Sequence, residues 1–250
     1  MTALRVATFN VRYDTPDDGD DAWPHRRERV VDRLTDIDAD LLGLQEATPH
    51  QLDYLREHLP DYEWLGVGRR GGDDGEHVPV AYHPDRITCE DWGAFWLSET
   101  PDEPSVGWDA SYPRVTTWAD CRIDGQPCQF VVTHLDHEGE RAREEGARLL
   151  REWVDTDDPA LVVGDFNATP ESRPVETVTS DGLRPAREAA ATATGPAQTF
   201  HEFTGDAHAR IDYVLTSDHF DVRRVETLAD DAPYPSDHFP VVADVELGTR

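Results

Sequence analysis

Residues 161–167 read LVVGDFN, a short apolar run that stops at Asp165 and Asn167. The same pattern occurs in DLLGLQ (40–45), which stops at Glu46, and in FVVTHL (130–135), which contains His134. Apolar runs of this length, without alternation, are typical of strands that are buried on both faces. Such strands need cover on both sides, so we predict a sheet core that is covered by helices.

The segments around these runs predict further elements. Residues 4–12, 62–68, 78–83, 210–216, 220–227 and 239–247 have strand patterns, Asp124-Gly125 is a hairpin signal, and residues 23–37, 49–58 and 138–153 have helical patterns. These strands are too many for one modest sheet, so we expect two packed sheets in an α/β fold. Because no repeat, linker or composition break interrupts the chain, we expect a single domain over residues 1–250.

Acidic residues dominate the composition. The chain has 52 Asp and Glu residues but only 23 basic residues, which are all arginine, and its formal net charge is −29. Self-repulsion of this size opposes compaction unless salt screens it. Because the acidity is spread over the whole chain, we interpret it as the surface of a halophile's protein. The alternative is an acidic protein that binds many cations. The charge argues against tight, unspecific nucleic-acid binding, which needs clustered cations.

Three further features bear on location. Cys89, Cys121 and Cys128 are odd in number and lack metal-ligand spacing, which indicates free thiols in a reducing compartment. A strand pattern begins close to the N-terminus and leaves no room for a signal peptide. No apolar run approaches the roughly 20 residues of a membrane helix. We therefore expect a cytoplasmic protein without a membrane partner, and no feature indicates an obligate protein partner.

Polar residues follow or end most of the predicted strands. These candidates are Asn10, Glu46, His134, Asp165, Asn167, Asp212, Asp237 and His238. Taken singly, each is best explained as a turn, cap or hydrogen-bonded structural residue. Together they fall at sheet ends, where loops lie near one another and carry function. Carboxylate, carboxamide and imidazole groups also suit Mg²⁺ or Mn²⁺.

Six short segments carry a family resemblance. They are TFN (8–10), LQE (44–46), THL (133–135), GDFN (164–167), RIDY (210–213) and SDH (236–238). In their order and strand context they resemble the endonuclease/exonuclease/phosphatase superfamily of DNase I-like and exonuclease III-like enzymes. Residues 16–26 and 95–110 are similar to a prokaryotic branch of it. The resemblance implies a four-layered α/β sandwich, in which helices flank two packed mixed β-sheets and the site lies at one end.

The resemblance also implies roles. Asn10, Glu46 and Asp237 would hold a divalent ion, Mg²⁺ or Mn²⁺, against a phosphate oxygen. Asp165 and Asn167 would position the attacking water or hold a second metal. His238 would be the essential histidine, oriented by Asp212, and His134 would contact the phosphate and protonate the leaving oxygen. Whether Asp165 or His238 is the general base stays open.

The leading hypothesis is therefore metal-dependent hydrolysis of a phosphomonoester or phosphodiester by in-line attack of water. One alternative is a nuclease or deadenylase that acts on single-stranded nucleic acid. Another is a catalytically inactive binding module that keeps the scaffold, although every expected position is filled. Arg12 stands where repair-type relatives carry an acidic residue, which argues against abasic-site cleavage.

Four secondary candidates remain. Arg114 would either clamp a phosphate or pair with surface acids. For Trp96 and Trp108, packing in the core is a better explanation than stacking on a substrate. His137, three residues after His134, could face the same site.

Overall fold

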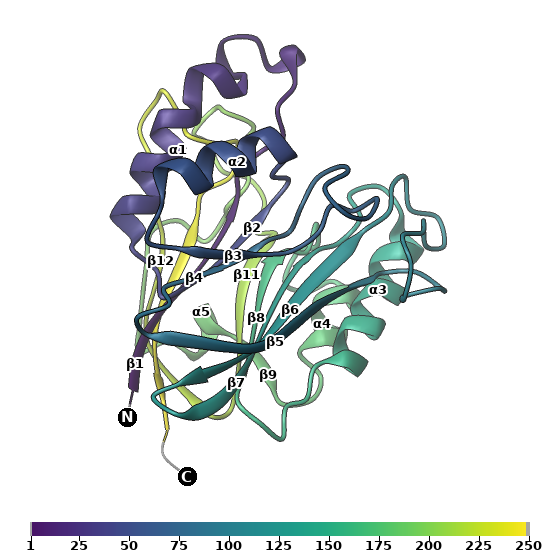
Figure 1. The fold of residues 1–250 in the computed structure, drawn as a ribbon, viewed down its shortest axis with the longest axis vertical. Helices are drawn as coiled ribbons and strands as arrows, with labels where there is room; N and C mark the ends of the chain where they lie inside the picture. The colour runs from purple at the N-terminus through teal and green to yellow at the C-terminus, as the bar shows by residue number, and fades with distance from the viewer. Residues whose placement is uncertain (1, 249–250) are drawn as a thin grey trace.

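Two sheets pack against each other at the centre of the computed structural model, which describes residues 2–248 (Figure 1). The first sheet has the order β10-β12-β13-β1-β2-β4-β3, and the second has the order β5-β6-β7-β8-β11-β9. Three pairs, β1 with β2, β7 with β8 and β10 with β12, are parallel, and the other pairs are antiparallel. The chain forms two sheets because it has too many short strands for one modest sheet.

The bounds of the strands follow the apolar runs. The first sheet contains β1 (Thr2–Asn10), β2 (Leu41–Gln45), β3 (Glu63–Leu65), β4 (Val80–Tyr82), β10 (Thr192–Thr194), β12 (Phe220–Thr227) and β13 (Val241–Leu247). The second contains β5 (Ile87–Trp96), β6 (Val115–Ile123), β7 (Gln126–His134), β8 (Ala160–Asp165), β9 (Leu183–Pro185) and β11 (Asp212–Ser217).

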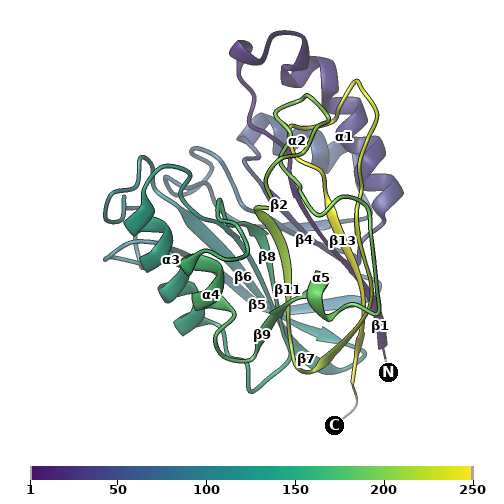
Figure 2. The same ribbon diagram turned by 180° about the vertical axis from the view of Figure 1, so that it is seen from behind.

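Helices cover the outer face of each sheet, so the layers run helix, sheet, sheet, helix (Figures 1 and 2). On the first sheet lie α1 (Trp23–Ile37) and α2 (Pro49–His58), and on the second lie α3 (Glu140–Trp153) and α4 (Arg173–Val178). The turn η1 (Pro16–Asp21) precedes α1, and α5 (Ala186–Ala189) is short. The predicted four-layered α/β sandwich is confirmed.

The sequence explains where the first two helices begin. In α1 the second residue is a proline, whose fixed φ suits a first turn, and Val30, Leu34 and Ile37 are buried at helical spacing. A capping box between Thr48 and Gln51 begins α2. The start of α1 is thus favoured by its proline, and the start of α2 by a capping box that satisfies amide groups of its first turn.

A glycine lets the two sheets approach each other closely. A Cβ atom added to Gly43 of β2 would lie 2.5 Å from Cγ2 of Val163 in β8 and 2.9 Å from both methyl carbons of Val132 in β7. Any larger residue would have to push the sheets apart, because protein cores are close-packed. This contact fixes the distance between the strands that end in Glu46, Asp165 and His134.

Most predicted elements are present with shifted ends. The hairpin at Asp124-Gly125 has positive φ at both residues, 51° and 83°, as a two-residue hairpin turn requires. The strand predicted from FVVTHL (130–135) begins earlier, at Gln126 directly after this turn. The predicted strands 62–68 and 78–83 shrink to three residues each, because a loop occupies the rest. No helix in the described part of the chain is both long and apolar enough to cross a membrane.

Candidate active site

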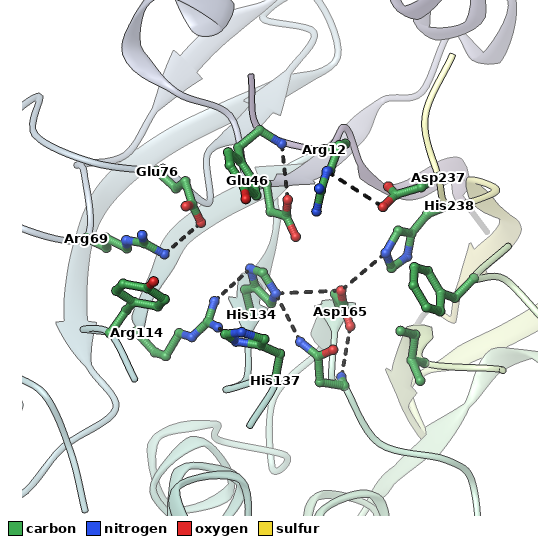
Figure 3. A pocket seen from close by; sticks show the side chains of 15 residues that line it. Arg12, Glu46, Arg69, Glu76, Arg114, His134, His137, Asp165, Asp237 and His238 are labelled. Carbon is green, nitrogen blue, oxygen red and sulfur yellow. Dashed lines mark hydrogen bonds and ion pairs between the residues drawn. The ribbon is translucent and has the colours of Figure 1, made fainter. Parts of the chain in front are cut away.

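Strand register brings the predicted site residues to one end of the sandwich, the end away from both termini (Figures 1 and 3). In the parallel pair β1–β2, Asn10 lies opposite Gln45, so Glu46 follows at the same edge. In the parallel pair β7–β8, His134 lies opposite Asp165. Asp165 also lies opposite Asp212 at the start of β11. A pocket at this end is lined by Glu46, His134, Asp165, Asn167, Asp237 and His238, together with Arg114.

Asn10 links carboxylates from the two sheets. Its buried side-chain amide donates one hydrogen bond of 2.9 Å to Oε1 of Glu46 and another of 2.9 Å to Oδ2 of Asp165. Its Oδ1 accepts the backbone N–H of Arg12 at 2.9 Å. The amide therefore orients both carboxylates, while its own oxygen is occupied.

Two polar residues of the site have left-handed backbone conformations. Glu46 has φ 66° and Asn167 has φ 47°, a region that non-glycine residues adopt at a cost. The turn at Glu46 follows a fully buried strand, and the backbone N–H of Tyr13 donates to its Oε2 at 3.1 Å. The backbone N–H of Asn167 donates to Oδ1 of Asp165 at 2.8 Å. These contacts hold the unusual turns in place.

His134 stands between Asp165 and Arg114. Its Nε2 lies 3.6 Å from Oδ2 of Asp165 and 3.1 Å from the side-chain nitrogen of Asn167. Its Nδ1 lies 3.3 Å from Nη1 of Arg114. Burial, reinforced by the charge of Arg114, holds the pKa of His134 well below its ordinary value. His134 is therefore a neutral imidazole at pH 7.

Arg114 is a buried member of the pocket and not a surface residue. Its side chain is 6% exposed, and its Nε donates to the equally buried Asp136 at 3.1 Å. Its Nη2 lies 2.6 Å from Nδ1 of His137. The fork of the guanidinium is thus fixed by three neighbours, and His137 lines the same pocket. The sequence alternative of a surface arginine that pairs with acids is therefore wrong as to the surface, because both Arg114 and its partner Asp136 are buried.

His238 differs from His134 in its charge state. Its Nδ1 lies 2.9 Å from Oδ2 of Asp212, and its Nε2 lies 3.9 Å from Oδ2 of Asp165. Burial alone would lower the pKa of His238, but the carboxylates of Asp212, Asp237 and Asp165 raise it to about 10. His238 is therefore an imidazolium at neutral pH.

The donor set fits a hard divalent cation. Glu46, His134 and Asp165 each offer a ligand atom, and these atoms lie within 4.8 Å of one another. Burial, with the charge of Asp212, raises the pKa of Asp165, and burial also raises the pKa of Asp237. A bound cation would relieve this crowding of buried carboxyl groups. A second group, Asp165, Asp212 and His238, has its histidine engaged with Asp212.

Asp237 lies at the edge of this group beside an arginine. Nε of Arg12 lies 3.9 Å from Oδ2 of Asp237, and Nη2 of Arg12 lies 2.9 Å from Oδ1 of Asp18. The two carboxylates hold the pKa of Arg12 above its ordinary value, despite its burial. Arg12 had been singled out in the sequence only as a departure from repair-type relatives, and it lines the pocket.

Other lining residues were missed by sequence reasoning. They are Tyr13, Arg69, Glu76, Tyr112, Phe200 and Ile211. The first five lie outside the helices and strands, where no periodic pattern marks them, whereas Ile211 lies directly before β11 and inside the predicted strand 210–216. Trp96 is buried, as expected, and its Nε1 donates to the carbonyl of Arg69 at 2.7 Å, so it supports a pocket loop.

A four-layered sandwich with a carboxylate and histidine pocket at one end defines the DNase I-like class of fold. The model of the Endonuclease/Exonuclease/phosphatase family matches residues 7–238, and the chain belongs to that family, whose hydrolases act on phosphate esters.

Solved structures of bacterial relatives are similar over nearly the whole chain. An endonuclease/exonuclease/phosphatase family protein from Bacteroides thetaiotaomicron is 35% identical with a TM-score of 0.95, and the match covers 99% of each chain. The mannosyl-6-phosphatase Bt3783 of the same organism is 34% identical with a TM-score of 0.92, over 98% of this chain and 100% of that one. An uncharacterised protein of Acanthamoeba polyphaga mimivirus is 26% identical, and its match covers 58% of this chain and 59% of that protein.

Proposed function

We propose that this protein is a divalent-metal-dependent phosphoesterase that hydrolyses a small phosphomonoester or phosphodiester. One observation carries the proposal. Asn10 orients the half-buried Glu46 and the buried Asp165, and both carboxylates line one pocket with His238, whose ring is held by Asp212. Such a pocket offers cation ligands on one side and a fixed positive imidazolium on the other, as phosphoryl transfer requires.

The metal would be held by Glu46 and Asp165, with His134, Asn167 and Asp237 around it and Asn10 orienting the carboxylates. When bound, Mg²⁺ or Mn²⁺ supplies charge neutralisation at the phosphate oxygens. Carboxylate and amide oxygens are the ligands that these cations prefer. We propose one shared site, since Glu46 and Asp165 receive hydrogen bonds from the same amide.

Asp165 is our candidate for the general base. Its carboxylate lines the pocket and is held by the side chain of Asn10 and by the backbone N–H of Asn167. His238 already holds its proton at neutral pH, so it serves as a cation that stabilises charge on the phosphate. The proton of the attacking water therefore passes to Asp165, while Asn167 helps to orient the water.

Arg114 and His134 would contact the phosphate. Arg114 is preorganised by Asp136, and a guanidinium binds phosphate oxygens with its planar fork. His134 is neutral, so it would contact the phosphate as an uncharged imidazole. Protonation of the leaving oxygen by His134, which the family resemblance implies, would require the second ring proton of the imidazolium form, which the lowered pKa disfavours. With His134 neutral, the leaving oxygen takes its proton from water.

The size of the pocket favours a small substrate. Its cavity volume is about 320 Å³, at the small end of the range for ligand sites. The relative named as a mannosyl-6-phosphatase also supports a small phosphomonoester. Cleavage of single-stranded nucleic acid, as by a nuclease or deadenylase, is the alternative, and it would need a cationic, aromatic-lined channel.

The acidic composition supports a proposal about the setting. We propose that the protein works in the salt-rich cytoplasm of a halophile, because its charge of −29 with no lysine suits concentrated salt. Assays should therefore contain molar KCl.

The test is a hydrolysis panel in molar KCl with Mg²⁺ or Mn²⁺. It contains an aryl phosphomonoester, an aryl phosphodiester, hexose phosphates, RNA, and single-stranded and duplex DNA, with Asp165→Ala and His238→Ala as paired variants. Metal-dependent cleavage of a small ester that both variants abolish supports the proposal. Preference for single-stranded nucleic acid favours the alternative. A folded, metal-binding protein that cleaves nothing would support the binding-module reading.

A further inference from the structure

One side of the pocket takes no part in the chemistry proposed above. Arg69 and Glu76 lie beyond Glu46 and Arg114, on the side away from Asp237 and His238 (Figure 3). Tyr112 also lines the pocket. We call Arg69, Glu76 and Tyr112 the distal wall. A phosphate held between Asp165, His238 and Arg114 would direct its organic group into the remaining space, which this wall bounds.

The distal wall pairs donors with an acceptor. Nη1 of Arg69 donates to Oε2 of Glu76 at 2.8 Å, and the backbone N–H of Arg69 donates to the backbone carbonyl of Glu76 at 2.9 Å. The side chains are only 12% and 15% exposed. Nε of Arg69 is buried without a hydrogen-bond partner among the described residues. Arg69 and Glu76 are thus paired with each other and fixed in place at the side of the pocket.

An aromatic ring completes this wall. The guanidinium of Arg69 lies 4.5 Å from the ring centre of Tyr112, and the Tyr112 ring stacks nearly parallel to His137, at 8°. Tyr112 is 42% exposed although it is a large aromatic residue. The exposed part of this ring lies beside paired polar groups and offers apolar contact to a ligand.

These features select a particular chemistry. A vicinal diol presents hydroxyl groups that both donate and accept, so it can donate to a carboxylate and accept from an adjacent guanidinium. The apolar part of the organic group can pack against the exposed part of the Tyr112 side chain. A second phosphate would not be favoured, because Glu76 already neutralises Arg69. A nucleic-acid strand would instead need unpaired cations.

We infer that the distal wall is the binding site for a vicinal diol of the substrate's organic group, as carried by a sugar phosphate or by the ribose of a nucleotide. Glu76 accepts from one hydroxyl, Arg69 donates to the neighbouring one, and Tyr112 packs against the ring. This inference rests on the proposed phosphoesterase function and names the substrate class for the same pocket.

The experiment compares three monoesters: a hexose 6-phosphate, a ribonucleoside 5′-monophosphate and phenyl phosphate, which has no hydroxyl groups. Glu76→Gln should raise KM for the preferred diol substrate about tenfold, as expected for one weakened hydrogen bond, with kcat less affected. Its kcat/KM for phenyl phosphate should stay within about twofold. Tyr112→Ala should act in the same direction, and Tyr112→Phe should retain most of the selectivity because it keeps the ring.

The chain supplies a matched control. Arg70 and Asp74 lie in the same loop, 3.9 Å apart, but their side chains are 53% and 70% exposed and do not line the pocket. Asp74→Asn should change none of the three activities. Thermal melting of each variant checks that it is folded.

The outcomes separate the two proposals. Selective loss of one diol substrate in Glu76→Gln supports the inference and identifies its source as sugar or ribose. Equal losses for the diol substrate and phenyl phosphate overturn it, and so does a wild-type protein that hydrolyses phenyl phosphate but neither diol ester. Loss of the diol activity in Asp74→Asn would also contradict it. If the wild-type protein hydrolyses no phosphate ester at all, the proposed function itself fails.

Discussion

Nδ1 of His238 lies 2.9 Å from Oδ2 of Asp212, and both side chains are buried at the end of the sandwich. Asp212 lies on β11 and His238 lies in the turn before β13, so the pair joins the two sheets. The carboxylate fixes one ring nitrogen as the proton donor and keeps the other facing Asp165. This pair sets the charge of the proposed site.

Asp212→Asn should lower kcat roughly 100- to 1000-fold with little change in KM, because the imidazole loses both its orientation and its charge. The carboxylate of Asp212 raises the pKa of His238, so the variant's pKa should be lower than about 10. A protonated His238 is the active form in our proposal. Activity should therefore disappear at a lower pH in the variant as the pH rises. Identical alkaline limits in pH–rate profiles of both proteins would contradict this assignment.

Glu46→Gln should weaken metal binding more than it slows turnover. Glu46 offers a ligand atom within 4.8 Å of those of Asp165 and His134. Loss of one carboxylate charge should raise the Mg²⁺ concentration for half-maximal activity about 10- to 100-fold. Titration of chelator-treated protein with Mg²⁺ measures this value. Glu63→Gln, at an exposed position in β3, is the control and should not shift it.

Arg26→Met should destabilise the fold. The guanidinium of Arg26 is fully buried and donates to the carbonyls of Val11, Arg12 and Pro235, the last at 3.0 Å and 209 residues away. Methionine would leave these carbonyls without a donor, at a cost of about 3 kcal/mol in the free energy of unfolding. Chemical denaturation measures the loss.

Arg26→Met should lower activity by more than the fraction of unfolded protein explains, because Arg26 holds the loops that carry Arg12 and Asp237. Arg29→Met on the same helix is the control, because Arg29 donates to the carbonyl of His25 within that helix. A loss of stability as large in Arg29→Met would show that the effect does not come from the bridged loops.

Stability should decrease in mild acid through His201. Burial, with the nearby charge of His238, lowers the pKa of His201 to about 4, and its Nδ1 accepts the N–H of Gly205 at 3.2 Å. The unfolded chain takes up this proton near pH 6.5, but the folded chain does so only near pH 4. His201 therefore favours the folded state fully above pH 6.5, and this contribution is lost as the pH falls from 6.5 towards 4.

His201→Phe should flatten the dependence of unfolding free energy on pH in that window. The slope of the unfolding free energy against pH should fall by at most the value for one proton, about 1.4 kcal/mol per pH unit. His58→Gln, at an exposed position, should leave the slope unchanged. An unaltered slope in His201→Phe would show that other groups control the acid sensitivity.

Concentrated salt should stabilise the protein. A formal charge of −29 causes self-repulsion that screening removes. The melting temperature should rise between about 0.2 M and about 3 M KCl, and most of the rise should occur at the lower concentrations, where screening changes fastest. Sucrose at matched osmolality is the control. A melting temperature that is insensitive to KCl would contradict the halophile proposal.

The sequence by itself determined the strand-end positions of the site and the class of fold. Asn10, Glu46, Asp165 and Asn167 directly end or follow apolar strands, and short apolar runs bounded by polar and turn residues mark such strands in the sequence alone. Parallel neighbours then bring such ends to one edge. Five short elements were not predicted, namely η1 and the four elements α4, β9, α5 and β10. They are too short to show a period.

Only the tertiary structure decided how the rest of the pocket is built. Arg12, Arg69, Glu76 and Tyr112 lie outside the strands and helices, and their positions depend on partners such as Asp18, Trp96 and His137 that no local pattern reveals. Burial likewise decided that Arg114 belongs to the pocket and that His134 and His238 differ in charge. The pKa of a side chain depends on desolvation and on charges within a few ångströms, and folding alone sets both.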